Sequence, residues 1–179
     1  MNPIYWDYNA TTPLDHQVRQ AMEPYLENVW GNPSSVHAVG RRARAALDEF
    51  RYRLAGAWKC RPSEVIFTSG GTESNNLAVL GTARLRGAQG YRHLVVSPVE
   101  HHAVLHALKH LEAHEGFTLT LVPVNHHGRV SPEAVAQALR PDTALVSIMA
   151  ANNETGTLQP VAEIGRLCRE RGVLFHTDA

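Results

Sequence analysis

The chain has 179 residues, of which 44% are hydrophobic and 19% charged, a composition typical of a soluble globular protein with a real core. Basic and acidic residues both number 17, so the net charge of zero gives no reason to expect a nucleic-acid or membrane partner. The N-terminus lacks the features of a signal peptide, and no apolar run approaches the roughly 18 residues of a membrane helix.

The first third of the chain predicts two helices joined by a turn. One helix is expected over residues 14–30, with Pro13 in its first turn, where a proline needs no backbone N–H. Turn residues follow, and Ser34 or Ser35 can cap a second helix with an apolar stripe over residues 39–57. We expect residues 1–60 to form an N-terminal helical segment.

Beyond this segment the pattern alternates between short apolar runs and helical stretches. Such alternation predicts βαβ units and a largely parallel sheet flanked by helices, so we expect an α/β domain over residues 61–179. The expected strands are Val65–Thr68, His93–Ser97, Thr118–Val122, Ala144–Met149 and Val173–His176, and the expected helices lie near residues 73–86, 101–114, 132–139 and 160–171.

A glycine turn follows the first expected strand. Ligands of parallel sheets bind outside the carboxyl ends of the strands, and Gly70, Gly71 and Thr72 lie at such an end. Backbone N–H groups at a helix start lack internal acceptors, and the helix dipole adds positive charge, so this turn can hold a phosphate. An ordinary turn between a strand and a helix has similar residues, and the motif alone does not decide between the two.

Three other expected strand ends carry polar side chains. His101 would start a helix, either as a common helix-start residue or as an imidazole that stacks on a ring and moves protons. Asn152 and Asn153 can hydrogen-bond a phenolate-like oxygen or simply form a turn. A carboxylate at Asp178 needs a cationic partner, such as a protonated pyridine nitrogen. Taken together with the glycine turn, these groups describe a site for pyridoxal phosphate.

Histidines also recur every four residues along one face of the helix after His101. Pairs of histidines at this spacing can bind zinc or nickel, but carboxylate or thiolate ligands are missing from this face. We interpret the stripe as solvent-exposed and predict no metal site. Its members are His102, His106, His110 and His114.

The two cysteines, Cys60 and Cys168, lie far apart and have no paired spacing. Neither a disulfide framework nor a zinc site is therefore expected, and a reducing, cytoplasmic setting is predicted.

Five stretches of the sequence resemble the cysteine desulfurases of the NifS/IscS type, in the class V branch of fold-type I pyridoxal-phosphate enzymes. The resemblance is collinear over all 179 residues and implies the first half of the large cofactor-binding domain. It implies removal of sulfur from L-cysteine, which leaves L-alanine and an enzyme persulfide, and transfer to an acceptor such as an iron–sulfur scaffold protein. The stretches are YWDYNATTP (5–13), GNPSSVH (31–37), FTSGGTESNN (67–76), EHHAV (100–104) and NNETG (152–156).

The resemblance also implies roles for individual residues. Gly71 and Thr72 would hold the cofactor phosphate, while His101 would stack on the ring and assist proton transfer. Asn153 would hydrogen-bond the phenolic oxygen, and Asp178 would pair with the pyridine nitrogen. The residues implied to line the substrate side are Asn9, Ala10 and Thr11.

The family's Schiff-base lysine, persulfide cysteine and substrate-binding arginine would lie beyond Asp178. Lys59 and Lys109, the two lysines, are not in the family's Ser-Gly-His-Lys segment, and Cys60 and Cys168 do not match its mobile-loop cysteine. We therefore expect the 179 residues alone to be inactive and to form a homodimer or to associate with a complementary C-terminal chain. The alternatives are a non-catalytic fragment that acts as a binding module, and part of another class V enzyme such as selenocysteine lyase.

Overall fold

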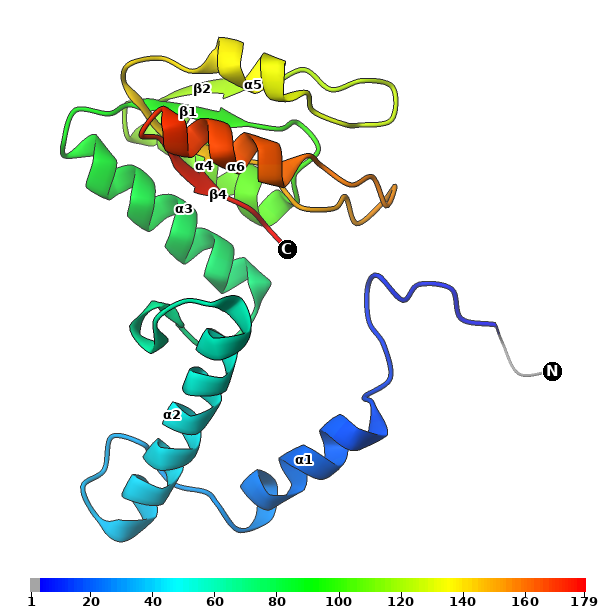
Figure 1. Ribbon diagram of the computed structural model, residues 1–179, viewed down its shortest axis with the longest axis vertical. Helices are drawn as coiled ribbons and strands as arrows, with labels where there is room; N and C mark the ends of the chain where they lie inside the picture. The colour runs from blue at the N-terminus through cyan, green and yellow to red at the C-terminus, as the bar shows by residue number, and fades with distance from the viewer. Residues whose placement is uncertain (1–3) are drawn as a thin grey trace. The chain divides into compact units, whose positions relative to one another are not determined.

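The computed structural model describes residues 4–179 as two compact units, of which the first ends at Phe67 and the second runs from Thr68 to Ala179 (Figure 1). Residues 1–3 of the predicted N-terminal segment lie outside the described residues. The boundary predicted after residue 60 stays a prediction. Within the described part of the chain, no helix combines the length and the apolar character needed to cross a membrane.

The first unit is helical, as the sequence predicts. The rings of Tyr25 and Phe50 meet edge to face with centroids 5.1 Å apart and join its two long helices. Asp48 accepts hydrogen bonds from both Arg44 and Arg51, at 2.9 and 2.7 Å. The elements of this unit are α1 (His16–Glu27), α2 (Ala38–Trp58) and the short 3-10 helix η1 (Pro62–Glu64).

The starts of α1 and α2 differ from the sequence prediction. The carboxylate of Asp15 accepts the Gln17 N–H at 2.8 Å, so α1 begins after Asp15, and the prediction that Pro13 lies in its first turn is wrong. At α2 the Nδ1 atom of His37 accepts the Gly40 N–H at 3.3 Å, so neither predicted serine is the cap. In both cases the cap is the side chain that reaches an orphan backbone N–H.

A matched pair of glycines in α2 gives a test of the first unit. A Cβ added to Gly40 would lie 2.4 Å from the Ser35 carbonyl oxygen, whereas one added to Gly56 would meet nothing within 4 Å. We expect Gly40→Ala to lower the free energy of unfolding by about 1–3 kcal/mol, since backbone must move. Gly56→Ala is expected to raise it by about 0.5–1 kcal/mol because alanine favours a helix. Urea unfolding measures both, and equal effects would contradict the tight approach at Gly40.

The second unit is an α/β domain whose four strands are all parallel, in the order β2-β1-β3-β4. The predicted fold class is confirmed, and four of the five predicted strands are present. The elements are α3 (Gly71–Gly87), β1 (His93–Val96), α4 (His102–His114), β2 (Thr118–Leu121), α5 (Pro132–Ala138), β3 (Thr143–Ser147), α6 (Val161–Glu170) and β4 (Leu174–His176).

The predicted strand Val65–Thr68 is wrong. The segment pairs with no other strand in the described part of the chain, and Ile66 and Phe67 are exposed, at 67% and 42%. Its apolar character favours a strand, but a strand also needs a neighbouring backbone to accept its hydrogen bonds.

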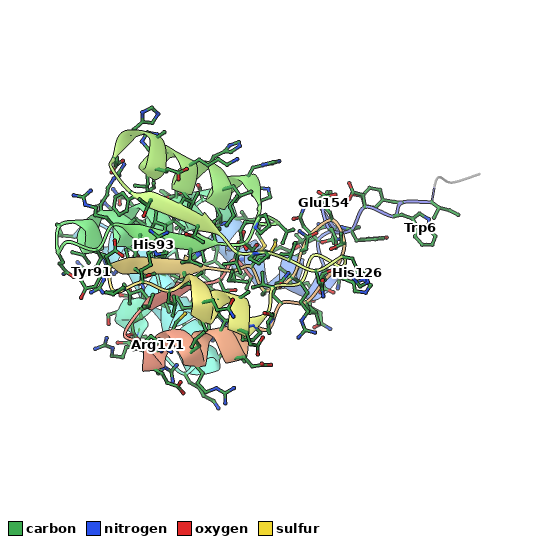
Figure 2. All side chains as sticks on the ribbon, turned by 90° about the horizontal axis from the view of Figure 1, so that it is seen from above. Trp6, Tyr91, His93, His126, Glu154 and Arg171 are labelled. Carbon is green, nitrogen blue, oxygen red and sulfur yellow. The ribbon has the colours of Figure 1, made fainter. Side chains whose placement is uncertain are left out.

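Helices cover both faces of the sheet, as Figure 2 shows with α4 on one side and α5 and α6 on the other. Along β1, Leu94 and Val96 pack into the cluster that contains α3 and α4 residues, while Val95 packs into the cluster of α5 and α6. The alternation follows from the two-residue period of a strand. The two central strands, β1 and β3, are buried along their whole length.

A buried histidine begins β1, at the amino edge of the sheet. His93 has no exposed surface, and its ring nitrogens lie 2.9 Å from Thr143 Oγ1 and 2.8 Å from Thr120 Oγ1. Burial lowers the pKa of His93, so the ring joins three strands as a neutral group. Figure 2 places His93 at one end of the sheet and Glu154 at the other, which is the end that carries the predicted site.

Candidate active site at the carboxyl edge of the sheet

The start of α3 offers free backbone donors. The N–H groups of Gly71, Thr72 and Glu73 have no acceptor among the described residues. A Cβ added at Gly70 or Gly71 would meet nothing within 4 Å, so an anion can approach this backbone. Gly70 itself is extended, with φ 167°, so no left-handed conformation requires a glycine there. What the glycine contributes is the lack of a side chain, which leaves the backbone accessible.

The turn before α3 is held by its own side chains. Glu73 accepts hydrogen bonds from the backbone N–H and the hydroxyl of Ser69, at 2.7 and 2.6 Å. These bonds lower the pKa of Glu73 and tie its carboxylate to the turn. The hydroxyls of Thr68 and Ser74 lie 2.6 Å apart and add a second link across the same turn.

His101 lies between two cavities. It caps α4, where its Nδ1 atom accepts the Ala103 N–H at 3.1 Å, and this bond fixes the ring while leaving Nε2 available. A cavity of about 570 Å³ between α3 and α4 is lined by Thr72 and His101. A second cavity, of about 300 Å³, is lined by His101, Asn153 and Asp178. The imidazole therefore connects the helix start that can hold a phosphate with the other predicted site residues.

The two consecutive asparagines have different surroundings. Asn152 is buried, and its Oδ1 atom accepts the backbone N–H groups of Glu154 and Thr155 at 3.0 and 2.9 Å. Its Nδ2 atom donates to the Val99 carbonyl at 2.9 Å, so Asn152 organises the loop. Asn153 lines the smaller cavity. Asn152 thus fits the turn interpretation, and the ligand role of Asn153 stays a prediction.

Asp178 lies just beyond β4, beside the same cavity. Its carbonyl accepts the Ala150 N–H at 2.8 Å, and its Oδ2 atom accepts a hydrogen bond from Asn75 Nδ2 at 2.9 Å. No basic side chain of the described residues forms an ion pair with it. A cation in the cavity would therefore find a carboxylate held by a neutral donor.

Sequence reasoning missed Glu100, which precedes His101. Only 5% of Glu100 is exposed, and its Oε1 atom accepts the Ser97 hydroxyl at 2.6 Å and the Met149 N–H at 2.8 Å. Its Oε2 atom is buried without a partner in the described part of the chain. Burial raises the pKa of Glu100 to about 7, helped by the charge of Asp178 and opposed by the two hydrogen bonds. Its signals in the sequence were its place in the loop between the expected strand His93–Ser97 and His101 and its place at the start of the EHHAV stretch.

The loop predicted to line the substrate side belongs to the first unit. The N–H groups of Ala10 and Thr11 donate to the Asp7 carbonyl, at 3.2 and 3.4 Å, and form a turn. The Tyr5 hydroxyl donates to the same carbonyl at 2.7 Å. The role of Asn9, Ala10 and Thr11 stays a prediction.

The remaining reactive side chains lie elsewhere. Lys109 is exposed on α4 and lines neither cavity at the site, while Lys59 ends α2 in the first unit. Cys168 is a fully buried residue of α6, and burial raises the pKa of its thiol to about 11, which makes it unreactive.

The four-residue histidine stripe on α4 is exposed, as the sequence predicts. Its first two rings, of His102 and His106, stack with centroids 5.2 Å apart. Among residues 4–179 the structure contains no group of three or more side chains arranged to hold a metal ion.

The residues at this edge fit a phosphorylated pyridine. Free N–H groups at the start of α3 suit the phosphate, and the imidazole of His101 lies beside both cavities. The carboxylate of Asp178, which has no basic partner among the described residues, suits a protonated ring nitrogen. Asn153, whose Nδ2 atom donates to Glu154 Oε1 at 3.0 Å, lines the same cavity.

Known proteins share this arrangement of sequence and fold. Residues 4–179 match the family model described as aminotransferase class V. The chain is 48% identical over 179 residues to a putative cysteine desulfurase, IscS 1, of Bacillus subtilis, covering all of this chain and 47% of that protein. It is 48% identical over 180 residues to the cysteine desulfurase of Homo sapiens, covering 39% of that protein.

Solved structures agree with these relatives. A NifS-like protein superposes with a TM-score of 0.91 at 39% identity, covering 98% of this chain and 48% of that one. The structure of SspA in complex with cysteine superposes with a TM-score of 0.90, also at 39% identity, covering 98% of this chain and 50% of the other. The chain thus spans about half the length of these structures and less than half of the curated relatives above.

Proposed function

Because the chain belongs to the aminotransferase class V family of pyridoxal-phosphate enzymes, we propose that it forms the cofactor-binding part of a cysteine desulfurase. The reaction takes L-cysteine to L-alanine and passes the sulfur, through an enzyme persulfide, to an acceptor. The observation that carries the proposal is that His101 lines both the cavity of Asn153 and Asp178 and the cavity that reaches Thr72 at the start of α3, where N–H groups have no acceptor among the described residues. The names of relatives and of a structure in complex with cysteine support this choice of substrate.

Each of these residues has a distinct task in the proposal. Gly71 and Thr72 bind the phosphate through backbone N–H groups, which carry partial positive charge at a helix start. When bound, pyridoxal phosphate supplies an electron sink for bond breaking next to the substrate amine. Asp178 holds a proton on the ring nitrogen by charge pairing, and Asn153 donates to the ring oxygen.

His101 has two tasks, because its ring orientation is fixed. Its Nδ1 atom is used by the Ala103 N–H, so the ring can stack only in the orientation that this bond allows. The Nε2 atom is then the one that exchanges a proton with the substrate.

Catalysis by the 179 residues alone is not expected in this proposal. Lys109 is exposed on α4, Lys59 is in the other unit, and the thiol of Cys168 is buried. The Schiff-base lysine and the persulfide cysteine would come from residues such as those in the second half of the relatives. We also propose a cytoplasmic protein that works as a homodimer or with a complementary chain, and that passes sulfur to an acceptor such as an iron–sulfur scaffold protein.

Completion of the chain tests the proposed function. The 179 residues are joined to the C-terminal half of the Bacillus subtilis relative, and alanine release from L-cysteine is measured with a thiol reductant present. We expect the completed protein to form alanine and sulfide in equal amounts, and the 179 residues alone to form neither. L-Selenocysteine is offered in parallel, because turnover of this substrate without turnover of L-cysteine would indicate a selenocysteine lyase. A completed protein that binds the cofactor but leaves L-cysteine intact would contradict the proposal.

A further inference from the structure

Asp178 is the end of a chain of partly buried hydrogen bonds that runs through three elements. Asn75 Nδ2, on α3, donates to Asp178 Oδ2 at 2.9 Å. His176 Nε2, on β4, lies 3.1 Å from Asn75 Oδ1. The Ser147 hydroxyl, on β3, lies 2.8 Å from His176 Nδ1. Asn75 is 5% exposed and Ser147 has no exposed surface, while His176 and Asp178 are half-buried.

The direction of each hydrogen bond follows from the first. A carboxylate only accepts, so Asn75 presents its amide nitrogen to Asp178 and its oxygen to His176. That oxygen can only accept, so Nε2 of His176 carries the proton. Burial lowers the pKa of His176, which favours a neutral ring. In a neutral ring with its proton on Nε2, the Nδ1 atom accepts the Ser147 hydroxyl proton, so the ring has one defined tautomer.

The position of Asn75 links the two ends of the proposed ligand site. It lies on the first turn and a half of α3, the helix whose N-terminal Gly71 and Thr72 are proposed to take the phosphate. Its side chain holds the carboxylate that is proposed to take the ring nitrogen, 103 residues further along the chain. One helix therefore fixes the spacing between the phosphate end and the nitrogen end.

We propose that Asn75 is a positioning residue that, with His176 and Ser147 behind it, fixes the Asp178 carboxylate toward the ring nitrogen of the bound cofactor. This inference rests on the proposed function. The side chains of Asn75, His176 and Ser147 are neutral. They therefore orient the carboxylate without supplying a positive charge that would compete with a pyridinium. Replacement of the amide by a cationic side chain would provide that competing charge.

The test uses two ligands that cannot form a Schiff base. One is pyridoxamine 5′-phosphate, and the other is its analogue with a C–H group in place of the ring nitrogen. Binding of each to the chain is measured by equilibrium dialysis. Wild-type protein is expected to prefer the nitrogen ligand by about tenfold or more, the size of a hydrogen bond to a charged group. In Asn75→Leu, which keeps the side-chain volume, we expect this preference to fall by about tenfold.

Gln159→Leu is the matched control for a loss of stability. Gln159 is also a buried amide, at 6% exposed, and it bonds to Val130 N–H and the Gly128 carbonyl, away from the two cavities at the site. We expect it to destabilise the fold but to leave the ligand preference unchanged. An unchanged preference in Asn75→Leu would overturn the positioning role. If wild-type protein binds neither ligand, the proposed function fails, and this result is distinct from the failure of the inference.

The tautomer of His176 tests this chain of hydrogen bonds without any ligand. Nitrogen NMR of the imidazole at neutral pH is expected to show a proton on Nε2 and a bare Nδ1. Ser147→Ala removes the donor to Nδ1, and we expect the Nδ1 nitrogen shift to move while Nε2 keeps its proton. A wild-type ring with its proton on Nδ1, or with both nitrogens protonated, would overturn the inference even if Asn75→Leu fails to fold.

Discussion

Asp178→Asn is expected to weaken the binding of pyridoxamine 5′-phosphate by about tenfold to a hundredfold, because a charged partner for the ring nitrogen is lost. Asparagine has nearly the same shape, and its oxygen can still accept the Asn75 amide proton, so the geometry at the end of β4 is retained. Binding of the analogue without the ring nitrogen is expected to change little. Equilibrium dialysis with both ligands measures the two effects.

Comparing the two ligands distinguishes loss of the Asp178 charge from loss of the fold. A loss of fold would weaken the binding of both ligands equally, whereas loss of the carboxylate weakens only the one with a ring nitrogen. Asp142→Asn is a suitable control, since Asp142 lies next to His93 at the other end of the sheet. Equal losses for both ligands in Asp178→Asn would show that Asp178 does not act on the ring nitrogen.

Glu100→Gln is expected to remove a pH dependence of about 3 kcal/mol from the free energy of unfolding. Burial raises the pKa of Glu100 from 4.5 to about 7 in the folded protein. Between these values the folded state keeps a proton that the unfolded chain has released. The contribution of Glu100 to stability is therefore fully present below pH 4.5 and is lost as the pH rises through 7.

Urea unfolding at a series of pH values between 4 and 8 measures this effect as a difference between wild type and Glu100→Gln. His93 and His176, whose pKa values are lowered by burial, titrate in both proteins and cancel in the difference. Their own contribution has the opposite direction, since stability falls as the pH drops below 6.5. Glu170→Gln, on the exposed end of α6, is the control for the same substitution at the surface. A flat difference for Glu100→Gln would mean that its carboxyl is solvated in the folded protein.

The sequence was a good guide to local features of the second unit. Apolar runs identified the central strands β1 and β3, because central parallel strands are buried on both faces. The common edge at which parallel strands end placed His101, Asn153 and Asp178 near one cavity, whereas the strand expected before Gly71 is not formed. These inferences need only the periods of strands and helices and the order of elements.

Features that depend on contacts distant in sequence could not be predicted. The Asn75–Asp178 hydrogen bond joins residues 103 positions apart, and no local pattern marks it. Burial of Glu100 depends on Met149, 49 positions away. The strand expected at Val65–Thr68 has suitable apolar residues, but the segment is not part of the described sheet. A local pattern fixes the preference of a segment, while its neighbours determine whether that preference is realised.

The central claim is that the start of α3 and the residues that follow β1, β3 and β4 bind one phosphorylated pyridine. Backbone amide NMR during titration with pyridoxamine 5′-phosphate tests it directly. We predict that the amides of Gly71, Thr72 and Glu73 shift together with those of His101, Asn153 and Asp178, along one saturation curve, and that inorganic phosphate at high concentration competes. Shifts confined to α3, or two groups of residues that saturate at different ligand concentrations, would contradict a single site.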